Sequence, residues 1–211
     1  MLHISTAQEV PLFDAGPLEK KRITAEACIH HLWFSDTDYA QKGALLKWDP
    51  AVKSAEDRAA IRQGVIDGRI DVVATDHAPH TLEEKALPYA KCPSGGPLIQ
   101  HSLVAMLEME REGVFTLAQV VEKLCHAPAR MFAIDRRGYI REGFHADLVL
   151  VDRASSWTVD RTNLLYKCGW SPFEGQRFTS QVVRTWVNGH SVFAAGRVDA
   201  TVRGERLRFD R

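Results

Sequence analysis

The sequence predicts an α/β unit followed by a smaller unit of antiparallel strands. Strand, helix and strand alternate between residues 22 and 74, an order typical of a parallel sheet covered by helices. Beyond about Gly138, β-type apolar runs dominate, and Asn188-Gly189 marks a tight hairpin turn. We therefore expect two units, residues 1–137 and residues 138–211.

Individual elements follow from local patterns. Residues 54–68 have an N-cap serine, acidic residues in the first turn and a closing Gly68, which predicts a helix. The β-branched run at residues 70–74 is typical of a strand buried on both faces. Residues 7–18 carry a weak helical pattern, and residues 33–48 resemble a loop. Strands are also expected at residues 2–6 and 22–29, and helices at 98–112 and at 117–125 after the capping candidate Thr116.

Composition excludes several classes of protein. The 27 basic and 27 acidic residues cancel, so no bulk charge favours nucleic acid or an anionic membrane as a partner. The four cysteines form no CxxC pair, which argues against a disulfide framework or a thiolate zinc site and favours a reducing, cytoplasmic setting. The sequence also has no apolar run of about 18 residues and no secretory signal pattern.

Histidine and acidic groups follow the predicted strands. They are His3, the pair His30-His31, and the cluster from Asp76 to His80. Functional groups gather at the carboxyl ends of parallel strands, and imidazole and carboxylate are ligand types suited to zinc. Asp76 is the best candidate to bind such a metal and to accept a proton from the attacking water.

Each of these groups also has a structural interpretation. An aspartate followed by Ala-Pro after a strand is equally well explained as a common turn or N-cap arrangement. His3 alone is better explained by a structural role than by metal binding. Neighbouring residues on a strand point to opposite faces, so only one of His30 and His31 could enter a shared site. Packing or a supporting role is the simpler interpretation of that pair.

The segment ATDHAPHTLEEK at residues 74–85 closely resembles the hallmark segment of class I dihydroorotases in the amidohydrolase superfamily. Allantoinases and hydantoinases share the Asp-His pair but usually continue it differently, so they are the enzymatic alternative. Four further segments fall in the family's order: HISTA (3–7), ITAEACIHHL (23–32), KWDPAVKSAEDR (47–58) and HADLVLVD (145–152).

The resemblance implies the C-terminal part of a distorted (β/α)8 TIM-type barrel with a small composite β domain. The segments match the sixth, seventh and eighth barrel strands and the following strands of the composite domain. Strands one to five have no counterpart in the chain.

The resemblance also implies roles for individual residues. His3 matches a histidine that binds the more buried ion of a binuclear zinc centre. Asp76 matches the aspartate that binds the other zinc and shuttles the proton. His80 matches a histidine that contacts the substrate carboxylate, and Ser94-Gly95 match a loop whose backbone meets the pyrimidine ring.

Two positions depart from the family pattern. Asp49 stands where the family usually places a substrate-binding asparagine, and its charge would repel an anionic substrate. Gly96 replaces a usual branched residue, which suggests a looser loop.

The implied reaction is the interconversion of dihydroorotate and N-carbamoyl-L-aspartate in pyrimidine biosynthesis. The other zinc ligands of the family have no counterpart here, so we expect this chain alone to be inactive, because two protein ligands do not hold a binuclear site. The non-enzymatic alternative is a silent subunit that stabilises a partner such as aspartate transcarbamoylase. A homodimer is a further candidate assembly.

Overall fold

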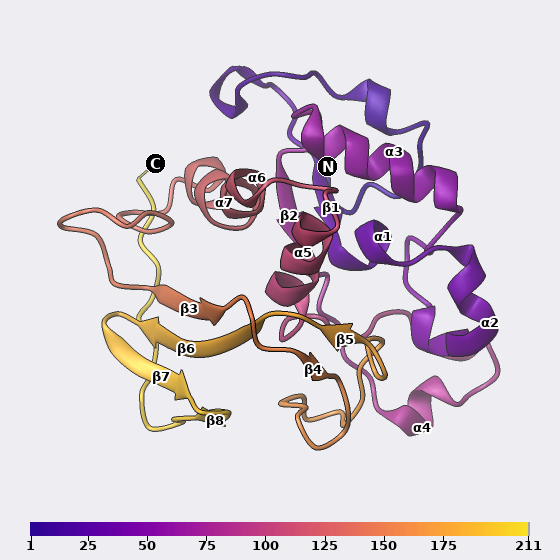
Figure 1. Ribbon diagram of the computed structural model, residues 1–211. Coiled ribbons are helices and arrows are strands. Elements are labelled where there is room, and N and C mark those ends of the chain that lie inside the picture. Colours follow the sequence, from indigo (N-terminus) through magenta and orange to yellow (C-terminus); the bar gives the residue numbers. More distant parts are fainter. Residues whose placement is uncertain (211) are drawn as a thin grey trace.

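A computed structural model describes residues 1–210 and shows a mixed α/β arrangement (Figure 1). At its centre, β1 (Glu26–Cys28) pairs in parallel with β2 (Val72–Ala74), with Cys28 opposite Ala74. The N-terminal segment lies along the other side of β1: the amide of Glu26 donates to the carbonyl of Met1, and the amide of Ile4 donates to the carbonyl of Glu26. The carboxyl ends of three neighbouring segments, residues 1–4, β1 and β2, therefore lie on the same side of the molecule.

The strands expected at residues 22–29 and 70–74 are present in shortened form, as β1 and β2. The segment at residues 2–6 pairs with β1 but is not a regular strand, and His3 has a positive φ of 39°. Within residues 1–210 the described strands do not close into a barrel.

The helix predicted at residues 54–68 is confirmed as α3 (Ala55–Ile66). Its N-terminus carries a capping box in which the Ser54 side chain accepts from the amide of Asp57, and the Asp57 carboxylate accepts from Ser54. The other oxygen of Asp57 accepts from the amide of Ala7 at 2.8 Å. Asp57, the third residue of the helix, thus ties α3 to the segment that carries His3.

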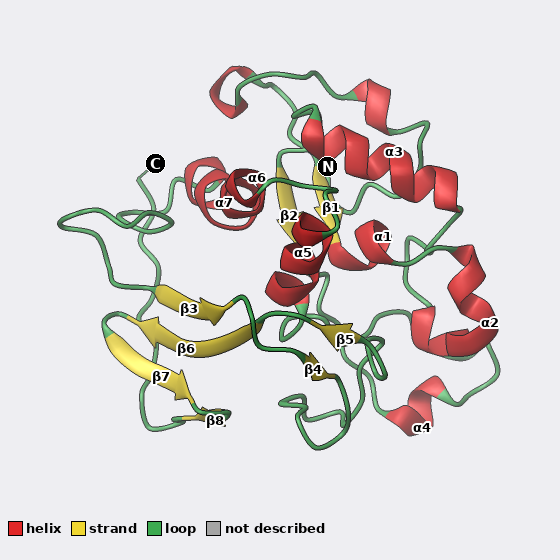
Figure 2. Cartoon of the chain, viewed as in Figure 1, coloured by secondary structure: helices red, strands yellow, loops and turns green. Residues whose placement is uncertain are grey.

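The other helices are shown in red in Figure 2. They are α1 (Ile29–Trp33), α2 (Tyr39–Lys42), α4 (Leu82–Lys85), α5 (Ser102–Arg111), α6 (Leu117–Val121) and α7 (Ala127–Met131).

Three expectations for helices and loops need correction. The weak helical pattern at residues 7–18 gives only short 3-10 turns, one with a proline at its start, because proline lacks the amide that an extended helix needs. The loop expected at 33–48 contains α2 and 3-10 turns. The helix predicted at 117–125 begins at its Thr116 cap, but it becomes a π-helical turn, η5 (Glu122–His126).

The later strands form a separate antiparallel sheet in the order β3 (Leu148–Asp152), β6 (Gln181–Val187), β7 (His190–Ala194) and β8 (Arg197–Val198). Asn188 and Gly189 form the predicted hairpin turn, both with positive φ. Between β3 and β6 the chain makes the short pair β4 (Trp157–Thr158) and β5 (Arg177–Phe178).

The core lies between the parallel pair, α5 and the loop from β4 to β5. Phe173 and Phe178 are buried there and contact the ring of Trp33 edge-on, at centroid distances of 5.4 and 5.7 Å. This aromatic cluster holds α1, and with it the end of β1, in a fixed position. Other fully buried members include Ile4, Ile29, Leu32, Ile61, Met106 and Met109.

Candidate metal and catalytic site

The carboxyl ends of the parallel pair place three potential metal ligands together. Cys28 is the last residue of β1, His30 lies two residues further on in α1, and Asp76 lies two residues beyond β2. One donor atom from each side chain lies within 4.8 Å of the other two. Asp76 has a positive φ of 47°, a conformation that is uncommon outside glycine and clusters at functional sites.

His30 is completely buried, and neither of its ring nitrogens has a hydrogen-bond partner within residues 1–210. Its ring stacks on Trp48 at a centroid distance of 4.6 Å, and its Nε2 atom lies 4.0 Å from Oδ2 of Asp76. A buried polar atom normally has a partner. The imidazole therefore combines a packed ring with an unsatisfied nitrogen that faces a carboxylate.

Burial shifts the pKa values of His30, Asp76 and Cys28. It holds the pKa of His30 well below the usual range, with smaller contributions from His31 and His3, so His30 and Asp76 are not an ion pair at neutral pH. Burial also raises the pKa of the Asp76 carboxyl, while His3 lowers it. The pKa of the Cys28 thiol is raised by burial and by the charges of Glu26 and Asp76.

The donor set fits a metal ion such as zinc. Imidazole, carboxylate and thiolate are all zinc ligands, and the free nitrogens of His30 lack any other partner in the described chain. His3 is not one of the three clustered donors, although it is close enough to affect the pKa values of His30 and Asp76.

Sequence reasoning missed Cys28 and treated His30 as packing. His30 and His31 are in α1 rather than on a strand, because β1 ends at Cys28. Their rings touch at a centroid distance of 4.0 Å, and Nε2 of His31 bonds to the carbonyl of Pro50 at 3.1 Å. The position of Cys28 at a strand end was the available clue.

The expected substrate-binding residues lie on loops. His80 is partly exposed, and its Nδ1 lies 3.5 Å from a carboxylate oxygen of Glu84. Asp49 is exposed and precedes a cis peptide bond to Pro50. Ser94 is partly buried and Gly95 is buried.

Lys85 fixes the loop that contains Ser94 and Gly95. Its side chain is almost fully buried, and Nζ donates to the carbonyl oxygens of Lys47, Pro93 and Gly95 at 3.3, 3.0 and 3.0 Å. Burial lowers its pKa. The amide of Gly95 in turn donates to the carbonyl of Lys47 at 2.8 Å.

The expectation of a looser loop at Gly96 is not supported by its surroundings. A Cβ atom at this position would lie 2.7 Å from the ring of Trp48 and 3.0 Å from the ring of Trp170. Its carbonyl accepts from the amide of Ala78 at 3.2 Å. Close packing of two tryptophans therefore accounts for the glycine.

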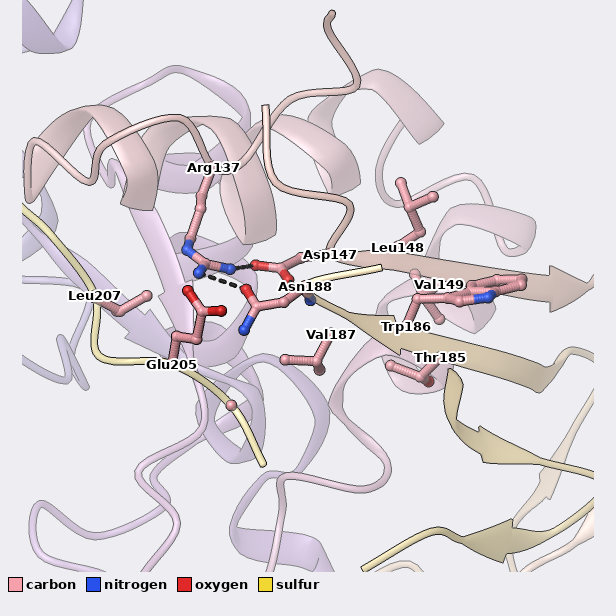
Figure 3. Close-up of a pocket in the computed structure, with 11 residues that line it drawn as sticks. Arg137, Asp147, Leu148, Val149, Thr185, Trp186, Val187, Asn188, Glu205 and Leu207 are labelled. Atoms are coloured by element: carbon pink, nitrogen blue, oxygen red, sulfur yellow. Dashed lines mark hydrogen bonds and ion pairs between the residues drawn. The ribbon is translucent and has the colours of Figure 1, made fainter. Parts of the chain in front are cut away.

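A separate pocket of about 380 Å³ lies beside the antiparallel sheet (Figure 3). Arg137 pairs there with Asp147 and donates to the side-chain oxygen of Asn188 at 2.7 Å. None of the expected site residues lines this pocket.

Comparison with known families identifies the class. The Amidohydrolase family matches residues 5–192, so the chain belongs to that family. The chain is similar to the dihydroorotase of Pyrococcus furiosus, with 36% identity over 205 residues that cover 97% of this chain and 47% of the relative. The dihydroorotase of Anaplasma phagocytophilum is 35% identical over 92% of this chain and 43% of its own.

The chain thus spans about half the length of the curated relatives it matches. Among solved structures, L-hydantoinase (dihydropyrimidinase) from Arthrobacter aurescens has a TM-score of 0.86 and 29% identity, covering 94% of this chain and 45% of that one. A D-hydantoinase has the same fold, with a TM-score of 0.81 and 22% identity over 93% of this chain and 45% of that one. No helix within residues 1–210 is long and apolar enough to cross a membrane.

Proposed function

We propose that the chain is the C-terminal portion of a dihydroorotase, a cyclic amide hydrolase that interconverts dihydroorotate and N-carbamoyl-L-aspartate. The position of Asp76 just beyond the end of β2, close enough to His3 for that residue to lower its pKa, carries the proposal. The similarity to two dihydroorotases at about 35% identity supports the choice of substrate. In this proposal residues 1–4, β1 and β2 are barrel strands six to eight, and β3, β6, β7 and β8 belong to a composite domain.

Asp76 is proposed as the general acid and base. It takes a proton from the attacking water and returns it to the leaving ring nitrogen, which requires a carboxylate near both atoms. Burial raises the pKa of Asp76 towards the working range of such a group. Its conformation at the end of β2 directs the side chain to the strand ends, where the substrate amide would lie.

His3 and Asp76 are proposed to hold zinc. When bound, the metal would polarise the amide carbonyl and lower the pKa of the attacking water. His3 also lies close enough to Asp76 to lower the pKa of that carboxyl.

The loops supply recognition of the substrate in this proposal. His80 would contact the substrate carboxylate, and the backbone of Ser94-Gly95 would contact the pyrimidine ring. The bonds from Lys85 and to Lys47 hold the latter loop in one conformation before any ligand binds. Asp49 would weaken binding of an anionic substrate.

A hydantoinase-type activity is the second candidate, favoured by the fold similarity to the L-hydantoinase structure. Dihydroorotate carries a carboxylate that a simple hydantoin lacks. Comparing turnover of the two substrates distinguishes the candidates. If neither substrate is turned over, we propose instead that the chain is a catalytically silent subunit that stabilises a partner such as aspartate transcarbamoylase. A homodimer is a further proposed assembly.

The test measures dihydroorotate hydrolysis and zinc content on the 211-residue chain, alone and mixed with the N-terminal half of the Pyrococcus furiosus relative. We expect activity in the mixture, and a loss of about 10²- to 10⁴-fold in kcat for Asp76→Asn, the range attributed to general acid–base catalysis. Asp147→Asn, in the remote pocket, is the matched control. Activity that survives Asp76→Asn would refute the assignment.

A further inference from the structure

We propose that Cys28, His30 and Asp76 form a metal site with one thiolate ligand, which this chain builds from its own residues. The family resemblance assigned His3 and Asp76 to zinc and gave Cys28 and His30 no role. The inference does not depend on the identity of the substrate.

The first support is geometric. The three donor atoms lie within 4.8 Å of one another without a metal. Around a tetrahedral zinc with bonds of about 2.0 to 2.3 Å, donor atoms lie roughly 3 to 4 Å apart. A contraction of about 1 Å, by rotation of the Cys28 and Asp76 side chains towards the ring of His30, would complete the site.

The second support is the state of His30. Its side chain is fully buried, and both ring nitrogens lack a partner in the described chain, although Nε2 faces Asp76. Stacking on Trp48 fixes the ring plane. An unpartnered, rigid imidazole aimed at a carboxylate has the orientation that a metal ligand requires.

The third support is the environment of Cys28. Its Sγ atom lies 3.6 Å from Oε1 of Glu26, which also accepts from the amide of His3 at 3.3 Å. Two carboxylates, Glu26 and Asp76, therefore face one buried thiol. A divalent cation would offset that charge.

Binding would form a sulfur–metal bond and release the thiol proton to solvent. Three protein ligands leave a fourth position for water or substrate, the pattern of catalytic rather than structural zinc sites. A thiolate also favours softer ions such as zinc over magnesium.

Cobalt(II) titration of the metal-free 211-residue chain tests the proposal, because cobalt bound to a thiolate absorbs in the near ultraviolet by charge transfer. We expect one such site per chain, displaced by zinc. Cys28→Ser should abolish the absorption and weaken zinc binding by more than the roughly 10- to 100-fold typical of losing a supporting residue. Cys125→Ser, at an exposed cysteine, is the control and should change neither.

X-ray absorption at the zinc edge on the unmutated chain gives an answer even if Cys28→Ser misfolds. One sulfur neighbour at about 2.3 Å is expected. Metal bound only by nitrogen and oxygen, no metal bound, or a charge-transfer band that survives in folded Cys28→Ser would each overturn the proposal. None of these readouts requires hydrolytic activity, so failure of the dihydroorotase assignment would be seen separately.

Discussion

The Nζ atom of Lys85 lies 3.0 Å from the carbonyl oxygen of Gly95, and this bond connects the end of α4 to a loop expected to meet the substrate. The same ammonium group holds two other carbonyls. No carboxylate within residues 1–210 pairs with this ammonium group, so the loop conformation depends on one buried, unpaired charge.

Replacing Lys85 with methionine should destabilise the chain by about 2 to 4 kcal/mol, because three buried carbonyls would lose a charged donor. Urea unfolding measures this loss. Hydrogen exchange at the amide of Gly95 should accelerate more than exchange in α3. Lys91→Met, at an exposed lysine, is the control, and an equal effect there would contradict the role of Lys85.

Gly96→Ala should cost about 1 to 3 kcal/mol through overpacking. The new Cβ would meet the outer ring atoms of Trp48. Trp48→Phe removes those atoms, so the double variant should be more stable than the sum of the single effects predicts. Strictly additive free energies of unfolding would show that Trp48 does not restrict position 96.

Asp76→Asn should stabilise the metal-free chain at pH 7. The pKa of Asp76 is raised in the folded state above its ordinary value of 3.8, so stability falls as pH rises from that value through the folded pKa. The asparagine variant avoids this loss, and the two chains should converge near pH 3. Unfolding measured with a chelator tests the prediction. Adding zinc should reverse the order, because the variant lacks a ligand.

His101 should make the chain sensitive to acid. Burial lowers its pKa to about 4, while its Nδ1 contacts the hydroxyls of Tyr166 and Ser171 at 3.1 and 3.2 Å. Below about pH 6.5 the unfolded chain binds a proton that the folded chain refuses until about pH 4, a penalty of up to about 3 kcal/mol. His101→Gln should flatten the fall in stability across this window. His190→Gln, at an exposed histidine, should not.

The fold was predictable where local chemistry decided it. Ser54 and Thr116 predicted helix starts that the structure confirms, and Asn188-Gly189 predicted the hairpin. The π-helical turn η5 was not predictable, because no local pattern marks it. There the buried ammonium of Lys123 donates to the carbonyl of Ile70 at 2.6 Å, a contact set by tertiary packing.

The candidate site was predictable only in part. Asp76 stood out through its strand-end position and its resemblance to a known segment. Cys28 did not stand out, because its proximity to Asp76 depends on the pairing of β1 with β2. The register that sets Cys28 opposite Ala74 cannot be read from the sequence. The role of His30 depended on the end of β1 at Cys28, a boundary that periodicity does not locate.

The two carboxylate oxygens of Asp57 bind different parts of the chain, which limits the substitutions that position 57 can accept. As the N3 residue of a capping box it would be exchangeable with glutamate or glutamine. Its second oxygen, however, binds the amide of Ala7, four residues from His3. In a mutational scan scored for catalysis, position 57 should therefore tolerate fewer replacements than in a scan scored for folding. Positions at which the two scans differ in this way would be residues that support the site without binding the metal.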